Sequence, residues 1–250
     1  RRNMEKKKWI IFAVVCLATI GFVFYLAKDQ KRDQDSTENI DTSKYDVTKY
    51  IGPNEDNGQI GDFYKGLAPE KAKLTTIEVF DSQCPGCAGL NPTIDGVMEK
   101  YKDKMTYVSR SIVIPAHTNS LAAQAAIIAG GLQNKYWEMK TAVLEKQNTW
   151  GLQNITDRTN TFYEIAKSIN IPNLEQFKSD MSSSRVKKKI DFDTKIAKSD
   201  KMEVKATPSI FFNGDSLSDT KKMGSKESLE TLIRENLEKV KVDIKNIKKY

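Results

Sequence analysis

The most reactive pattern in the chain is Cys84-Pro85-Gly86-Cys87, two cysteines separated by a proline and a glycine. The pair stands where a β-branched segment gives way to a helical pattern, so we expect Cys84 at the N-terminus of a helix. Unpaired backbone N–H groups and the helix dipole stabilise an anion there, which lowers the pKa of a thiol. Cys87 follows closely enough to close a disulfide with Cys84, so the motif predicts thiol–disulfide exchange.

Two other roles for this cysteine pair stay open. A structural disulfide closing a ring of four residues would stabilise the fold by only about 2 kcal/mol. A zinc site needs four ligands, and the chain offers one histidine and no second cysteine pair. We therefore favour redox chemistry, which needs no cofactor beyond the Cys84–Cys87 disulfide itself.

The elements around the motif predict a β-α-β unit over residues 73–114. Strands are expected at 73–80 and 105–114, with a helix at 87–102 between them. Pro92 lies inside that helix and should kink it. A crossover helix favours parallel pairing of the two strands.

Helical patterns dominate the next part of the chain, residues 119–204. We expect these helices at 120–129, 136–146, 161–169, 174–182 and 186–201. A short strand follows at 208–213, then a hairpin turn at Asn213-Gly214-Asp215 and an amphipathic helix at 225–247. The chain therefore predicts β-α-β, a helical block, and β-β-α.

These pieces together resemble the DsbA-like branch of the thioredoxin-fold thiol:disulfide oxidoreductases. The similar stretches are IEVFDSQCPGC at 77–87, Pro92, RSIVIPAH at 110–117, KYWEM at 135–139 and KATPSIFFNG at 205–214. The resemblance implies an α/β thioredoxin fold, formed by 63–118 and 205–250, with a helical domain inserted at 119–204.

The resemblance also implies roles for individual residues. Cys84 would be the exposed nucleophile and Cys87 the buried resolving thiol. Pro208 would be a cis-proline facing the disulfide, and Thr207 before it would help to hold the substrate chain. The alternative for Pro208 is simply the start of a strand.

Glu78 corresponds to a buried acid near the resolving cysteine in this family. Strand alternation puts Glu78 and Phe80 on one face, and a buried carboxylate could exchange protons with Cys87. The alternative is a solvent-facing glutamate on an edge strand. We expect Asp81 to serve the local turn, and His117, the only histidine, to serve capping or packing rather than a Cys–His hydrolase.

The dipeptide between the cysteines departs from the strongly oxidising members of the family. Many of those have a histidine there, which stabilises the thiolate, whereas Pro85 and Gly86 carry no side-chain donor. We therefore expect a less depressed pKa at Cys84 and a less oxidising potential.

The N-terminal part predicts a membrane anchor. Residues 9–27 are apolar and uncharged, and as a helix they would span about 28 Å. The basic tail 1–8 before them should stay cytoplasmic, which puts everything after Lys28 outside. A cleaved signal peptide is the alternative, although a cut after Ala27 would put Tyr25 at position -3, which fits a cleavage site poorly.

Composition and charge exclude other classes. A mean hydropathy of -0.54 is too polar for a polytopic membrane protein, and three cysteines are too few for a disulfide-dense scaffold. Of the net charge of +7, the tail 1–8 carries +4, so nucleic-acid binding loses its support. Polar residues 28–62 predict a tether, with local order near 45–51, and we expect the folded domain to begin near Phe63.

Together these features predict a single-pass membrane protein with an extracytoplasmic disulfide oxidase domain. Its substrates would be cysteine-containing exported proteins, and the resemblance implies reoxidation by a quinone-linked membrane partner of the DsbB or vitamin-K-epoxide-reductase type. A reductase or isomerase of the same fold is the nearest alternative. A membrane-anchored metal-binding or metallochaperone module using the same cysteines is the alternative from another class.

Overall fold

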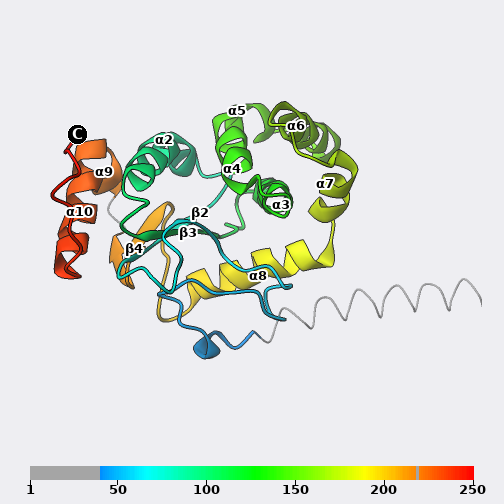
Figure 1. Cartoon of the computed structure of the whole chain (residues 1–250). Helices are drawn as coiled ribbons and strands as arrows, with labels where there is room; N and C mark the ends of the chain where they lie inside the picture. Colours follow the sequence, from blue (N-terminus) through cyan, green and yellow to red (C-terminus); the bar gives the residue numbers. More distant parts are fainter. Residues whose placement is uncertain (1–39, 218–219) are drawn as a thin grey trace, which may run out of the picture. The chain divides into compact units, whose positions relative to one another are not determined.

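A mixed sheet lies at the centre of the protein, seen in a computed structural model that describes residues 40–217 and 220–250 (Figure 1). In these residues the sheet has five strands in the order β1-β3-β2-β4-β5. They are β1 (Phe63–Gly66), β2 (Thr75–Phe80), β3 (Thr106–Ser111), β4 (Ser209–Phe212) and β5 (Asp215–Leu217). β2 pairs parallel with β3 and antiparallel with β4, so β2 is the central strand. β1 pairs antiparallel with β3, and β5 pairs antiparallel with β4.

The helices follow the predicted order. They are α2 (Pro85–Lys100), α3 (Ser120–Gly131), α4 (Tyr136–Glu145), α5 (Gln147–Trp150), α6 (Ile155–Ser168), α7 (Leu174–Met181), α8 (Ser184–Lys198), α9 (Thr220–Met223) and α10 (Lys226–Lys239). A 3-10 helix, η1 (Thr42–Lys44), precedes them. α2 connects the parallel strands β2 and β3, which confirms the β-α-β unit. Helices α3–α8 stand between β3 and β4 as an insertion, and α2 and α8 lie on opposite sides of the sheet (Figure 1).

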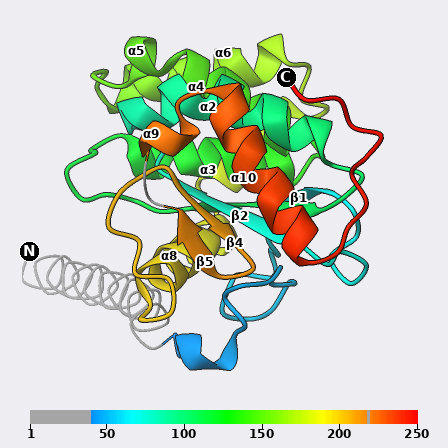
Figure 2. The same ribbon diagram turned by 90° about the vertical axis from the view of Figure 1, so that its left-hand side faces the viewer.

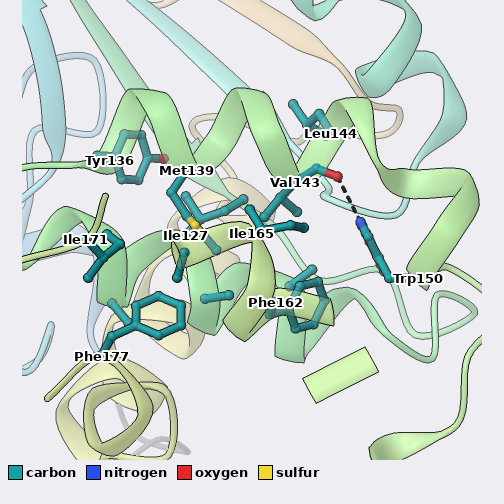
Figure 3. Close-up of a cluster of buried hydrophobic side chains, with 14 of the residues drawn as sticks. Ile127, Tyr136, Met139, Val143, Leu144, Trp150, Phe162, Ile165, Ile171 and Phe177 are labelled. Carbon is teal, nitrogen blue, oxygen red and sulfur yellow. Dashed lines mark hydrogen bonds between the residues drawn. The ribbon is translucent and has the colours of Figure 1, made fainter. Parts of the chain in front are cut away.

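Several apolar clusters hold these layers together, and two of them contain residues of α2. One lies within the insertion (Figure 3), and it also contains Phe80 at the end of β2 and Cys87 of the motif. The other joins α2 to α10 and to the sheet, and the two helices lie close together in Figure 2. Side chains such as Val97, Ile233 and Leu237 make this second contact and are fully buried. The insertion is therefore packed directly against the second cysteine.

Most predicted elements are confirmed, with shifted ends. α6 begins at Ile155 rather than 161, and α10 ends at Lys239 rather than 247. α2 begins before the predicted position and continues through Pro92. The hairpin turn has positive φ at Asn213 (49°) and Gly214 (99°), as a tight β-hairpin turn requires. The four-residue elements β1, α5 and α9 were not predicted, because such short segments show no clear periodicity.

The predicted tether is wrong for residues 41–62, which belong to the same folded unit as the sheet. Val47, Ile51 and Ile60 are buried, and Asp62 is a buried charge. The polar composition of this segment concealed its packing, because much of its attachment is ionic. The predicted tail 1–8, the anchor 9–27 and the remainder of the tether up to residue 39 lie outside the described residues. Within the described ranges, none of the helices has the length and apolar character to span a membrane.

A buried ionic network attaches this segment to β3 and α8. Asp62 accepts from Arg110 at 2.7 Å and from Lys189 at 3.0 Å, and Lys189 also pairs with Asp193 at 2.7 Å. Arg110 donates as well to the carbonyl of Val47, at 2.6 Å. Burial alone would raise the pKa of Asp62, but the two cations outweigh it and lower the pKa. The carboxylate is thus the counter-charge for two buried cations.

Replacement of Asp62 should destabilise the fold strongly. Asp62→Asn leaves Arg110 and Lys189 buried with too little negative charge, and we expect a loss of about 3–5 kcal/mol in the free energy of unfolding. Urea unfolding measures this value. The matched control is Asp191→Asn, which removes the exposed pair with Lys187 and should change stability by less than about 0.5 kcal/mol. Similar losses in both variants would contradict a structural role for the network.

Candidate active site

Cys84 occupies the N-cap of α2, directly after the central strand of the sheet. Its φ of -72° and ψ of 120° are extended, and its carbonyl accepts the first helical hydrogen bond from Ala88 at 3.2 Å. Pro85 is the first residue of the helix, where its lack of an N–H group costs no hydrogen bond. The position predicted for Cys84 is therefore confirmed.

The two cysteines have opposite environments. Cys84 is partly exposed, whereas Cys87 is only 1% exposed and lies in the apolar cluster of the insertion. Neither cysteine is in a disulfide. When Cys84 is protonated, its thiol donates to the carbonyl of Thr207, with the sulfur 3.4 Å from the oxygen. A partner molecule can therefore reach Cys84 but not Cys87.

Several hydrogen bonds lower the pKa of Cys84 to about 5. The largest contribution is the hydrogen bond from the Cys87 thiol. The side chain of Thr207 and the backbone N–H groups of Cys87 and Gly86 add to it, and partial burial opposes them. This value lies between those typical of thioredoxin, about 7, and of DsbA, about 3.5. It agrees with the expectation of a less depressed pKa where no histidine separates the cysteines.

Burial raises the pKa of Cys87 far above its usual range. Its hydrogen bond to Cys84, the negative charge of Cys84 and the more distant charge of Glu78 act in the same direction. At neutral pH the reduced pair therefore consists of one thiolate and one thiol, with the proton on Cys87.

The Thr207–Pro208 peptide bond is cis, as the resemblance implied. The loop that carries it lies against the motif. A Cβ atom added to Gly86 would stand 3.6 Å from the Thr207 oxygen and 3.8 Å from Cδ of Pro208. Pro208 itself is buried. The structure thus brings Cys84 and Gly86 next to Thr207 and Pro208, which follow them in the chain by more than 100 residues.

Glu78 is buried rather than solvent-facing, and it is paired. Its carboxylate accepts from the Lys140 ammonium and from the Tyr107 hydroxyl. Lys140 also lies 4.6 Å from the ring of Phe80, which confirms that Glu78 and Phe80 share a face of β2. The resemblance implied a buried acid here but gave no partner for it.

Lys140 is the site residue that the sequence analysis missed. It is fully buried on α4, and the other buried positions of that helix are Tyr136, Met139, Val143 and Leu144. A lysine within such an apolar stripe signals a buried counter-charge, because an unpaired ammonium would not be tolerated there.

Asp81 and His117 have the local roles that we expected. The Asp81 carboxylate accepts from the backbone N–H of Gln83 at 2.7 Å and of Ile114 at 2.8 Å. His117 Nδ1 lies 3.0 Å from Oδ1 of Asp81, so this histidine packs against the turn.

The comparison with protein families now identifies the fold. A family model described as thioredoxin matches residues 67–235, which include the motif, the whole insertion and the cis-proline loop. The chain belongs to the thioredoxin family. Membership in this family confirms the resemblance that the motifs suggested.

Relatives with assigned names fall into two groups. The chain is 29% identical over 179 residues to "Na(+)/H(+) antiporter NhaA 1" of Mycolicibacterium gilvum, with 67% of this chain and 27% of that protein covered. It thus spans about a quarter of that relative. It is 24% identical over 212 residues to "Probable disulfide bond formation protein D" of Bacillus anthracis, with 82% and 86% covered.

Solved structures of other thioredoxin-family proteins share the fold. BdbD from Bacillus subtilis, in its oxidised form, matches with a TM-score of 0.57 and 18% identity, covering 76% of this chain and 98% of that one. α-DsbA1 from Wolbachia pipientis matches with a TM-score of 0.58 and 24% identity, covering 72% and 92%. MdbA from Corynebacterium diphtheriae, a thiol-disulfide oxidoreductase, matches with a TM-score of 0.57 and 20% identity, covering 75% and 93%. The thioredoxin fold with an inserted helical domain is therefore confirmed.

The pKa of Cys84 can be measured by alkylation of the reduced protein. The rate of reaction with iodoacetamide should follow the thiolate and rise through a midpoint at about pH 5. Cys84→Ser should abolish this fast phase. A midpoint near the ordinary thiol value of about 8.5 would contradict the hydrogen-bonded site.

The same pKa makes the stability of the reduced protein depend on pH. Between about pH 5 and 8.5 the unfolded chain keeps the Cys84 proton that the folded protein has lost. The unfolded state therefore binds more protons, and rising pH stabilises the reduced protein relative to the oxidised one over this window. Thermal unfolding of both forms of the wild-type protein should show the difference. Cys84→Ser cannot form the disulfide, and the stability of its single form should lack this rise with pH.

Loss of Lys140 should leave the Glu78 carboxylate buried without a cation. We expect Lys140→Met to lower the free energy of unfolding by about 3–5 kcal/mol, and Glu78→Gln in the same chain to recover most of the loss. Urea unfolding measures both. Lys135→Met, which breaks the exposed pair with Glu138, should cost less than about 1 kcal/mol. No recovery in the double variant would show that the lysine acts through packing alone.

Proposed function

We propose that this thioredoxin-family protein is a thiol:disulfide oxidoreductase that oxidises cysteine pairs in exported proteins. The observation that carries the proposal is the low pKa of Cys84, about 5, next to a buried Cys87. A stabilised thiolate favours the reduced form of the pair, and this makes the disulfide form an oxidant. The exchange uses the Cys84–Cys87 disulfide and no other cofactor.

The reaction consists of two exchanges between sulfur atoms. A substrate thiolate attacks Sγ of Cys84 in the oxidised protein, the Cys84–Cys87 bond breaks, and Cys87 leaves with the electron pair and takes a proton. The second substrate thiolate then attacks the substrate sulfur of the mixed disulfide and displaces Cys84 as a thiolate. Two electrons pass from the substrate dithiol to the pair. The low pKa of Cys84 makes it a good leaving group in the second step.

We propose that Glu78 assists the protonation of Cys87. Its negative charge favours the protonated form of Cys87 and so helps the departing sulfur to take up a proton. Lys140 and Tyr107 hold the carboxylate in the sheet, so its position does not depend on solvent. The lysine and tyrosine are positioning residues in this scheme.

The surroundings of Cys84 suit an extended polypeptide substrate. Residues 205–206 before Thr207 are exposed, so a substrate chain can approach the Thr207 backbone and pair with it. The loop after α5 and the start of α6 add apolar surface, with Leu152 99% exposed and Ile155 70% exposed. This loop adjoins the motif, because Gly151 accepts from Gln83. An exposed apolar surface next to the motif suits unfolded polypeptide chains as substrates.

Membrane attachment, location and reoxidation belong to the same proposal. The apolar segment 9–27 would anchor the protein with the catalytic domain outside the cytoplasm. The reduced pair would then pass its two electrons to a quinone-linked membrane protein of the DsbB or vitamin-K-epoxide-reductase type. The relative named as a disulfide bond formation protein supports disulfide formation as the reaction of this pair.

The metal-binding alternative gains no specific support. Among the described residues, no three side chains of His, Cys, Asp or Glu form a cluster that could hold a metal ion. A reductase or isomerase remains the relevant alternative, because the same dithiol site serves both directions and only the potential distinguishes them.

Oxidation of a reduced peptide with two cysteines tests the proposal. The oxidised protein should convert the peptide to its disulfide rapidly, and Cys84→Ser should lose this activity. The potential of the pair, measured against glutathione, should lie between those of DsbA, about -120 mV, and thioredoxin, about -270 mV. A value near that of thioredoxin would favour a reductase, and a value at or above that of DsbA would contradict the effect ascribed to Pro85 and Gly86.

A further inference from the structure

A glutamine of the insertion binds the backbone of the redox motif. Gln147 begins α5 and is buried, and its Nε2 donates to the Ser82 carbonyl at 2.8 Å and to the Cys84 carbonyl at 3.1 Å. The Cys84 carbonyl is also the acceptor of the first hydrogen bond of α2. One amide group thus holds the two carbonyls that flank the turn leading into the catalytic helix.

A side chain next to the motif also forms hydrogen bonds with the insertion, and we call this contact region between motif and insertion the junction. Gln83, next to Cys84, donates from Nε2 to the Gly151 carbonyl at 2.8 Å and accepts at Oε1 from the Asn119 backbone at 2.6 Å. The Asn119 side chain then donates to the carbonyls of Trp150, Gly151 and Gln153. The motif and the insertion are therefore linked from both sides by side-chain amides.

α5, the helix that carries Gln147, is held in place by the core of the insertion. Trp150, at the end of α5, is fully buried, and its Nε1 donates to the Val143 carbonyl of α4 at 2.8 Å (Figure 3). Phe162 of α6 packs on the indole, with ring centroids 5.3 Å apart. α5 cannot shift without breaking the core of the insertion, so Gln147 presents its amide from a fixed position.

We propose that Gln147 is a positioning residue of the redox site, which holds the Ser82 and Cys84 carbonyls and so fixes the turn that places the Cys84 sulfur at the start of α2. A peptide unit is planar, so fixing the Cys84 carbonyl also fixes the start of the helix that follows it. Cys84 is the N-cap of this helix, where the unpaired backbone N–H groups and the helix dipole stabilise a thiolate. This inference rests on the proposed role of Cys84 as the exchanging thiol.

Removal of the amide should weaken the thiolate. Gln147→Met keeps the length of the side chain and removes the donor, and we expect the pKa of Cys84 to rise by about half a unit to one unit. The equilibrium with glutathione should shift towards the oxidised pair by about three- to tenfold. The pKa is measured on the full chain in reduced form, from the thiolate absorbance at 240 nm against pH.

The matched control is Gln133→Met, elsewhere in the insertion. Gln133 also makes two bonds to backbone, donating to the Asn173 carbonyl at 2.9 Å and accepting from its N–H at 2.8 Å. Its loss should affect folding similarly but leave the pKa of Cys84 unchanged. An unchanged pKa in Gln147→Met, or an equal rise in the control, would overturn the inference.

If Gln147→Met does not fold, Gln147→Leu tests the same point. Its side chain is also neutral and offers no amide donor to the two carbonyls, so the pKa of Cys84 must again rise. Neither measurement needs a substrate. A wild-type protein that fails to oxidise the peptide while Gln147→Met still shifts the pKa would refute the proposed function and leave the positioning role intact.

Discussion

Two sulfur atoms within one helical turn must have opposite environments, and the rest of the structure depends on this requirement. The Cys84 thiolate needs hydrogen-bond donors and access for a substrate, whereas the Cys87 thiol needs exclusion from water. The central strand β2 delivers both residues to one edge of the sheet, and the start of α2 supplies backbone N–H groups to the first sulfur. The second condition could not be met by the thioredoxin strands alone, because the apolar cover over Cys87 comes from the insertion.

Buried charges attach the added parts of the chain to this core. Lys140 joins α4 to Glu78 of β2, and Asp62 joins the N-terminal segment to Arg110 of β3. Buried pairs of this kind add little net stability compared with apolar contacts, but a missing partner is costly. Such pairs therefore specify one docking position for each added part, since a shifted arrangement would leave a charge without its counterpart.

Local patterns were sufficient to predict the longer elements and the reactive pair. The β-branched run before Cys84, the helical spacing after it and the Asn213-Gly214 turn each carry their own signal, and the motifs together revealed the cis-proline at Pro208. Contacts between distant residues were not predictable in this way. Nothing near Asp62 in the chain indicates Arg110, and the polar segment around Asp62 resembled a linker. Lys140 was detectable in principle from its place in an apolar stripe, but its partner was not.

The position of the insertion has an evolutionary consequence. Domain insertions are usually regarded as independent modules that can be exchanged between relatives. Here the inserted helices bury one catalytic sulfur, neutralise a carboxylate of the central strand and bind the motif backbone through Gln147. Sequence changes in the motif and in the inserted helices must therefore be inherited together. A chimera with the motif of one parent and the helices of another would combine mismatched halves of a single redox centre.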